Sequence, residues 1–137
     1  MTKDEVLDFL NENPAFALAT SEGTNPHVRI LMLHKVDDSG IYFMVGKFKD
    51  VYRQISINPS VELCFFRENR QVRVTGVAEN LDKDLSLKKE ILEARPFLKP
   101  WIEQSGLKHM AVFRIKKGTA VYWSLETELK PKEFVEL

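Results

Sequence analysis

This 137-residue sequence has a single cysteine and no net charge. The one cysteine, Cys64, excludes an internal disulfide and a cysteine-rich zinc site. Twenty Lys and Arg side chains balance twenty Asp and Glu side chains, so no overall field attracts nucleic acid or an anionic membrane. We therefore expect no nucleic-acid partner, no membrane partner and a thiol-reducing compartment, the cytoplasm.

Long apolar runs and glycine-rich nucleotide motifs are also missing. The longest apolar runs cover only a few residues, far short of a membrane span. The first ten residues, MTKDEVLDFL, lack the continuous apolar stretch of a secretory signal. Because neither GxGxxG nor a P-loop occurs, a nucleotide-type ligand would have to be held in another way. A chain of this length is expected to form one domain, residues 1–137.

The hydrophobic pattern predicts a mainly β fold with small inserted helices. Apolar residues with period 2 predict strands at residues 15–20, 27–36, 41–45, 61–67, 71–80, 109–115 and 119–125, with a short edge strand in 130–137. The strands 109–115 and 119–125 are expected to form a hairpin that turns at Lys117-Gly118. Regular hairpin spacing without βαβ alternation favours a closed antiparallel barrel of six or seven strands.

Helices are expected where the spacing of apolar residues changes from the period of a strand to that of a helix. Thr2 and Glu5 have capping-box spacing at the start of the first helix. Asp50 is the expected N-cap of a second helix. In the third helix, residues 81–94, the expected core residues are Leu85, Ile91 and Leu92. Pro100 is expected to break the piece that follows, residues 97–106.

The strand at residues 71–80 has one apolar face and one polar face. Val72, Val74, Gly76 and Ala78 form the first, and Gln71, Arg73 and Thr75 the second. The polar face is either solvated or lines something polar.

Arg29, Lys47 and Lys49 are candidates for an anion site. Arg29 shares a strand face with Leu31 and Leu33, where a charge is costly unless it is paired. The two lysines come just before a predicted helix N-terminus, where free amides and the helix dipole favour phosphate. Arg29 can bind a phosphate with two donors, and Lys49 can add a point charge. The alternative is that Arg29 pairs with an acidic residue and that the lysines face solvent.

The remaining reactive side chains show no catalytic or metal-binding pattern. The three histidines, His27, His34 and His109, are scattered without carboxylates at ligand spacing, so no metal site is expected. Cys64 lies among apolar neighbours and is interpreted as a buried, inert thiol. Trp123 could face a ligand, the core or an interface.

Four segments follow one another along the chain: ALATSEGTNPHVRILMLHK, IYFMVGKFKDVYRQISINPSVEL, RQVRVTGVAENL and AVYWS. In this order they resemble the pyridoxamine 5′-phosphate oxidase-like family of FMN-binding split barrels. The resemblance extends over nearly the whole chain. It implies an antiparallel split β-barrel that binds FMN at the two-fold interface of a homodimer.

The resemblance also implies a set of cofactor-binding residues. Arg29 and Lys49 match the residues that hold the FMN phosphate. The other matched positions are Ile30, Leu31 and Met32 beside the flavin ring, Met44 and Val45 at its edge, Gln71 reaching the flavin, and the aromatic Trp123. No catalytic residue is identified.

The function implied is that of an FMN-dependent oxidoreductase acting on a small-molecule substrate, with a reduced donor such as NAD(P)H. Vitamin B6 oxidases of this family carry arginine and histidine in a C-terminal segment that grips the substrate phosphate. The segment SLETELKPKEFVEL has neither, so true pyridoxamine phosphate oxidase activity is not expected. The alternative is a non-catalytic flavin- or haem-binding module, a carrier or a sensor.

Overall fold

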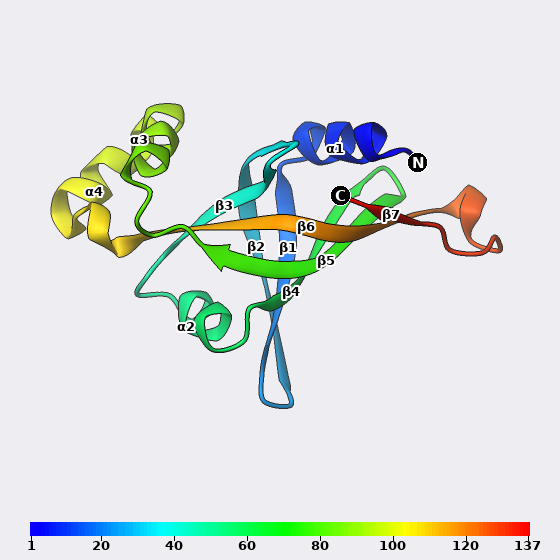
Figure 1. Cartoon of the computed structure of the whole chain (residues 1–137), viewed down its shortest axis with the longest axis horizontal. Helices are drawn as coiled ribbons and strands as arrows, with labels where there is room; N and C mark the ends of the chain where they lie inside the picture. The colour runs from blue at the N-terminus through cyan, green and yellow to red at the C-terminus, as the bar shows by residue number, and fades with distance from the viewer.

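The computed structural model describes residues 1–137 as an antiparallel β-barrel with helices around its outside (Figure 1). The strands are β1 Ala15–Glu22, β2 Asn25–Asp37, β3 Gly40–Gly46, β4 Ser60–Arg67, β5 Arg70–Asn80, β6 Met110–Ser124 and β7 Phe134–Glu136. The α-helices are α1 Lys3–Glu12, α2 Asp50–Ile57, α3 Leu85–Ala94 and α4 Lys99–Ser105. Short 3₁₀ turns are η1 Pro96–Leu98, η2 Leu107–His109 and η3 Leu125–Thr127. None of the helices is long and apolar enough to cross a membrane.

Six strands close the barrel, and the seventh extends it. The strand order is β3-β2-β1-β4-β5-β6-β7, and an additional β3–β6 pairing closes the ring. All the pairings are antiparallel. The predicted fold class, a split barrel of six or seven strands, is therefore confirmed.

The predicted hairpin at Lys117-Gly118 is wrong, because β6 runs through this position as one strand. On one side β6 pairs with β5 along its length, and on the other it pairs first with β3 and then with β7. Gly118 lies opposite Gly76. A Cβ on Gly118 would come within 2.9 Å of the Val74 side chain and 3.1 Å of the Thr75 carbonyl oxygen. This glycine permits close strand contact and does not mark a turn.

The helix boundaries follow the predictions in part. Thr2 and Glu5 form the predicted capping box of α1. Lys49, not Asp50, is the N-cap of α2, so that prediction was one residue too late. Pro100 lies in the first turn of α4 and does not break it, because that turn needs no amide donor from it.

The inward face of α3 differs from the predicted one. Ile91 is buried and Leu92 is half-buried, but Leu85 is 51% exposed, and Leu87 is buried instead. Asp84 accepts a hydrogen bond from the Leu87 amide and caps the helix, so Leu85 is its first residue. The helix therefore turns Leu87 and Ile91, four positions apart, toward the barrel.

The structure has two apolar cores, one inside and one outside the barrel. The inner core includes the aromatic side chains Phe16, Phe43, Phe65 and Phe113. The second core lies between the outer side of β3 and β6 and the helices α3 and α4, and consists of Tyr42, Leu87, Ile91, Ile102, Met110 and Val112. Figure 1 shows α3 and α4 together at one side of the barrel. The sequence IYFMV in β3 is apolar throughout because both of its faces are covered.

Candidate functional site

An open groove of about 530 Å³ lies between β2, β3 and the beginning of α2. Of the nine predicted cofactor-binding residues, those that line it are Arg29, Ile30, Leu31, Met44, Val45 and Lys49. Met32, Gln71 and Trp123 are not among its lining residues. The fold thus brings the two predicted phosphate-binding side chains to one groove, although β3 separates them in the sequence.

Arg29 enters the groove from β2 and has only neutral hydrogen-bond partners. Its Nη1 donates to Thr20 Oγ1 at 2.7 Å and to the Leu18 carbonyl oxygen at 3.4 Å. Its Nη2 donates to Gln54 Oε1. The alternative that Arg29 pairs with an acidic residue is wrong, because no carboxylate lies within ion-pair distance of it.

Burial lowers the pKa of the Arg29 guanidinium, and the negative charge of Asp50 acts in the opposite direction. Arginine stays charged even so. Burial of the charged guanidinium costs desolvation free energy, and the neutral partners and Asp50 offset only part of it. Asp50 is the one carboxylate that lines the groove, against two cationic side chains, those of Arg29 and Lys49. An anion in the groove would lower the free energy of this arrangement.

Thr20 and Gln54 were not identified from the sequence, yet they hold Arg29 in place. Both are buried, at 4% and 2% exposure, and Thr20 Oγ1 also donates to Gln54 Oε1 at 2.6 Å. One signal was present: Gln54 follows Val51 by three residues and precedes Ile55 on the apolar face of its helix. A polar side chain at such a position needs a buried partner.

The two lysines before α2 have different surroundings. Lys49 is exposed at the groove, makes no ion pair, and has its ammonium 5.8 Å from the ring centroid of Phe48. Lys47 forms an ion pair with Asp82, in which its Nζ lies 2.7 Å from Asp82 Oδ2. Asp82 also binds the buried Lys88, at 2.8 Å. Only Lys49 is free to meet a ligand in the groove.

Desolvation raises the pKa of Asp82, but hydrogen bonds from Lys47 and Lys88 outweigh it and leave the pKa below its ordinary value. Asp82 therefore stays ionised at neutral pH and fixes both lysines. Lys88 donates in addition to the Leu107 carbonyl oxygen at 3.3 Å. This cluster belongs to the attachment of α3 and not to the groove.

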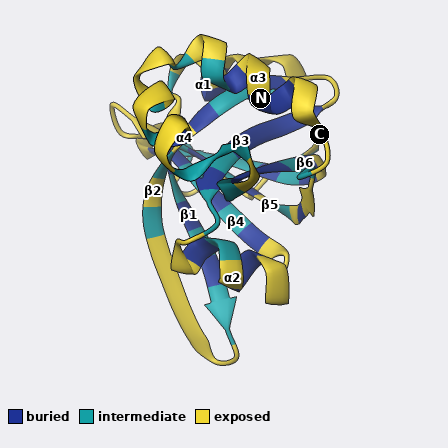
Figure 2. Cartoon of the chain, turned by 90° about the vertical axis from the view of Figure 1, so that its left-hand side faces the viewer, coloured by how far each residue is buried: buried dark blue, intermediate teal, exposed yellow.

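The outer face of β2 beside the groove is an exposed apolar stripe formed by Val28, Ile30 and Met32. Their exposed fractions are 70%, 69% and 47%. Figure 2 shows the exposed length of β2 below the barrel. Apolar side chains gathered in this way are typical of an interaction surface. Met32, which does not line the groove, lies on this stripe.

Gln71 and Trp123 lie opposite each other on β5 and β6. They line a separate cavity of about 230 Å³ together with Arg73, Tyr122 and Lys130. The Trp123 indole N–H donates to a Glu128 carboxylate oxygen. The polar face of β5 is thus divided: Gln71 and Arg73 line a cavity, whereas Thr75 is exposed.

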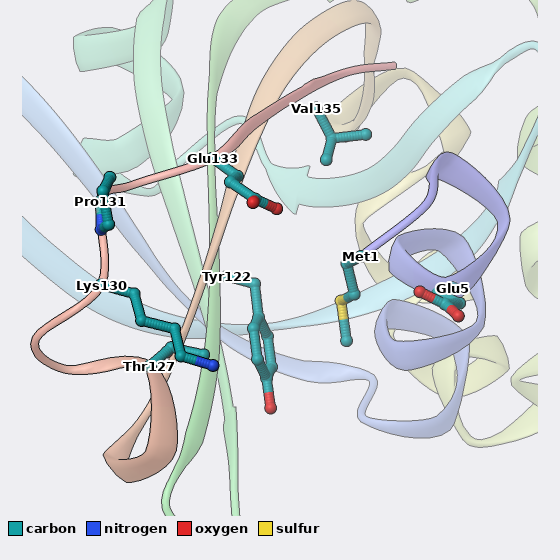
Figure 3. Close-up of a pocket in the computed structure, with 8 residues that line it drawn as sticks. All are labelled: Met1, Glu5, Tyr122, Thr127, Lys130, Pro131, Glu133 and Val135. Carbon is teal, nitrogen blue, oxygen red and sulfur yellow. The ribbon is translucent and has the colours of Figure 1, made fainter.

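A second cavity, of about 330 Å³, adjoins this one where the two ends of the chain meet. Figure 3 shows Tyr122 standing between Met1 on one side and Lys130 of the C-terminal segment on the other. Tyr122 and Lys130 line both cavities. Neither cavity shares a residue with the groove at Arg29.

The histidines and the cysteine do not form a site in the structure. His34 Nε2 lies 2.7 Å from Glu90 on α3, and this hydrogen bond lowers the pKa of Glu90 despite an opposing desolvation effect. No group of His, Cys, Asp or Glu side chains could hold a metal ion. Cys64 is half-buried, where full burial was predicted, and burial raises the pKa of its thiol.

The donor set of the groove fits the terminal phosphate of FMN. Arg29 has donors left after its neutral contacts, and Lys49 carries an unpaired charge. Lys49 is also the N-cap of α2, and its side chain makes no capping hydrogen bond, so no side chain of the cap competes for the first-turn amides. Met44 supplies apolar surface for a ring further along the groove, whereas Val45, which also borders the groove, is buried in the inner core.

A closed antiparallel barrel with a cationic groove at its side defines a split-barrel protein of the flavin-binding class. The sequence profile of the pyridoxamine 5′-phosphate oxidase family matches residues 2–123. The chain belongs to this family, which is typically flavin-binding.

Several known proteins are similar to this chain. Pyridoxine/pyridoxamine 5′-phosphate oxidase from Psychrobacter cryohalolentis is 36% identical over 80 residues, which are 56% of this chain and 37% of that protein. A NimC/NimA family protein from Clostridium acetobutylicum is 29% identical, with a TM-score of 0.79, over 98% of this chain and 92% of the other. General Stress Protein 26 from Bacillus anthracis is 21% identical with a TM-score of 0.77, over 98% of both chains, and shows the same fold. The match to the oxidase thus spans less than half of that enzyme's length.

Proposed function

We propose that this protein binds FMN at the interface of a homodimer and acts as an oxidoreductase on a small molecule. The observation that carries the proposal is the pair Arg29 and Lys49, two cations without carboxylate partners at one groove. Such a pair is suited to a dianionic terminal phosphate. The structure offers no second cationic cluster in this groove for a pyrophosphate, which favours FMN over FAD.

In this function the chain's residues bind and orient the cofactor. Arg29, held in place by Thr20 and Gln54, would set the position of the phosphate. The β2 backbone at Ile30 and Leu31 and the Met44 side chain would border the ring, because these residues line the groove beside Arg29. When bound, FMN would supply the redox chemistry between a donor such as NAD(P)H and a small acceptor, while the protein supplies binding and orientation.

The homodimer is supported by two features of the surface. The apolar stripe of Val28, Ile30 and Met32 is uncovered in the single chain and borders the groove. Gln71 and Trp123 lie in a different cavity from Arg29, so one chain alone does not bring all the predicted residues together. A second copy docked on the stripe would supply its Gln71 and Trp123 to the first copy's groove. Two-fold pairing is the commonest arrangement of such dimers.

We propose a substrate other than pyridoxamine phosphate. Residues 125–137, which border the cavities near Gln71 and Trp123, contain neither arginine nor histidine. The residues that grip the substrate phosphate in vitamin B6 oxidases are therefore missing from this segment.

The test is a fluorescence-quenching titration with FMN, FAD and riboflavin, followed by stopped-flow reduction of the bound flavin with NADH and NADPH. We expect binding in the order FMN, then FAD, then riboflavin, and bleaching of the flavin by at least one nicotinamide. Failure to bind FMN would end the proposal. Tight FMN binding without reduction by either donor would favour a non-catalytic carrier or sensor over an oxidoreductase.

A further inference from the structure

Phe48 connects helix α4 to the proposed phosphate-binding lysine. The ring centroids of Phe48 and Trp101 are 5.7 Å apart, with their planes inclined by 53°. The Phe48 ring centroid also lies 5.8 Å from Lys49 Nζ. Trp101, Phe48 and the Lys49 ammonium thus form a continuous row of contacts that ends at the groove.

The backbone before Phe48 makes room for its ring. A Cβ on Gly46 would come within 2.7 Å of Phe48 Cε1, so the ring folds back over a residue that has no side chain. Gly46 itself lines the groove. Phe48 is 63% exposed, yet its ring lies against Gly46 and Trp101.

Trp101, which contacts the Phe48 ring, is itself held in place by packing. It is half-buried and packs against the second core, which joins α3 and α4 to β3 and β6. The loop of residues 46–49 is also held at Lys47, whose amide donates to the His109 carbonyl oxygen at 2.8 Å. Lys49 closes the loop through its amide, which donates to the Gly46 carbonyl oxygen at 3.0 Å.

We propose that Trp101 is a positioning residue that acts through Phe48 to hold Lys49 at the groove for a ligand phosphate. This inference rests on the proposed FMN function and deepens it. A lysine side chain is flexible and loses entropy when it meets a ligand. The cation–π contact with Phe48 restricts the ammonium in advance, and Trp101 restricts Phe48. We expect the effect only for ligands that carry a phosphate, because the phosphate is the proposed partner of Lys49.

The first experiment compares Trp101→Ala with the wild type in titrations with FMN and riboflavin. We expect FMN affinity to fall about two- to tenfold, as for loss of one aromatic contact, with riboflavin affinity unchanged. Trp101→Phe should restore the FMN preference. The matched control is Leu92→Ala, which also removes packing from the second core but makes no aromatic contact with Phe48. It should lower the melting temperature and keep the ratio of FMN to riboflavin affinity.

The second experiment asks whether the effect passes through Lys49. In a Lys49→Ala background, Trp101→Ala should cause no further loss of FMN affinity. Phe48→Leu, a change at an exposed position that preserves the fold, should lower FMN affinity about two- to fivefold.

Four outcomes would count against the inference. Equal losses for FMN and riboflavin in Trp101→Ala, or losses that add in the double variant, would overturn it. A wild type that prefers FMN, with the same preference kept in Trp101→Ala and Phe48→Leu, would overturn it and leave the proposed function standing. A wild type that does not distinguish FMN from riboflavin would overturn both.

Discussion

The Arg29 guanidinium on β2 and the Gln54 side-chain amide on α2 meet across the end of the groove, where the guanidinium donates to the amide oxygen. Thr20 on β1 donates to the same oxygen at 2.6 Å. Three elements are thereby joined at one buried acceptor. The guanidinium is held by neutral groups, which keep its orientation and leave its charge available to a ligand.

Replacing Arg29 with alanine should weaken FMN far more than riboflavin, which has no phosphate. Loss of a charge-assisted contact costs about 1.5–3 kcal/mol, about ten- to a hundredfold in affinity. Arg29→Lys should give an intermediate loss, because it keeps the charge but not the paired donors. Titration of each variant with both flavins measures the effect, and circular dichroism checks the fold. Equal losses for the two ligands would show that Arg29 supports the barrel or the ring.

Replacing Lys49 with alanine should act in the same direction but less strongly, because a flexible ammonium makes a less directional contact. Lys116→Ala is the matched control, since it removes the same charge from an exposed position on β6 that does not line the groove. We expect Lys116→Ala to leave FMN affinity unchanged at 0.15 M salt, where distant charges are largely screened. A loss in both variants would indicate a general charge effect in place of a phosphate contact.

The exposed stripe on β2 predicts that Ile30→Glu converts a dimer to a monomer. A carboxylate at the centre of an apolar interface would be buried without a partner. Light scattering at micromolar concentration should give twice the chain mass for the wild type and the single mass for the variant. Phe97→Glu changes an equally exposed apolar residue on η1 and should leave the mass at the dimer value. A monomeric wild type with flavin bound would contradict the homodimer.

Asp82 predicts a pH-dependent contribution to stability. Its pKa is lower in the folded protein than in the unfolded chain, so its contribution is complete above the unfolded pKa and is lost as the pH falls through the folded pKa. Asp82→Asn should therefore cost about 1 kcal/mol of unfolding free energy at pH 7, allowing for the partial exposure of the carboxylate.

The cost of Asp82→Asn should shrink below about pH 4, the ordinary range of an aspartate. Urea unfolding of both proteins between pH 3 and pH 7 measures it. Asp38→Asn is the control, because Asp38 is exposed and forms no ion pair. A difference between wild type and Asp82→Asn that stays constant down to pH 3 would refute the linkage.

Most of the barrel could be predicted from local patterns, and the errors lie where a residue serves a distant partner. Gly118 looks like a turn residue, but it is a glycine because β5 passes close to it at Gly76. Leu85 looks like a core residue, but the cap at Asp84 fixes the direction of the helix. In both cases the missing information concerns a neighbour that periodicity does not reveal.

Only some of the groove residues could be predicted from the sequence, because the others depend on distant neighbours. Arg29 and Lys49 stand out in the sequence because each is a charge in an unusual setting, and the fold brings them together. Gln71 and Trp123 line a separate cavity of the single chain, and in the proposed homodimer a second copy would supply them. Phe48 and Trp101 carry no sequence signal, because their contact arises only when α4 packs beside the loop 46–49.

The uninterrupted course of β6 has a consequence for the order of folding. Ile41 on β3 pairs with Ile115 on β6, so the ring cannot close until most of the chain has been synthesised. Until then β3 and β5 each present an open edge, which is prone to pair with another chain. Such long-range closure slows folding, because the entropy of a large loop is lost before its contacts form. A nascent chain released before residue 110 would expose both edges and should aggregate, even though five of the six barrel strands were already complete.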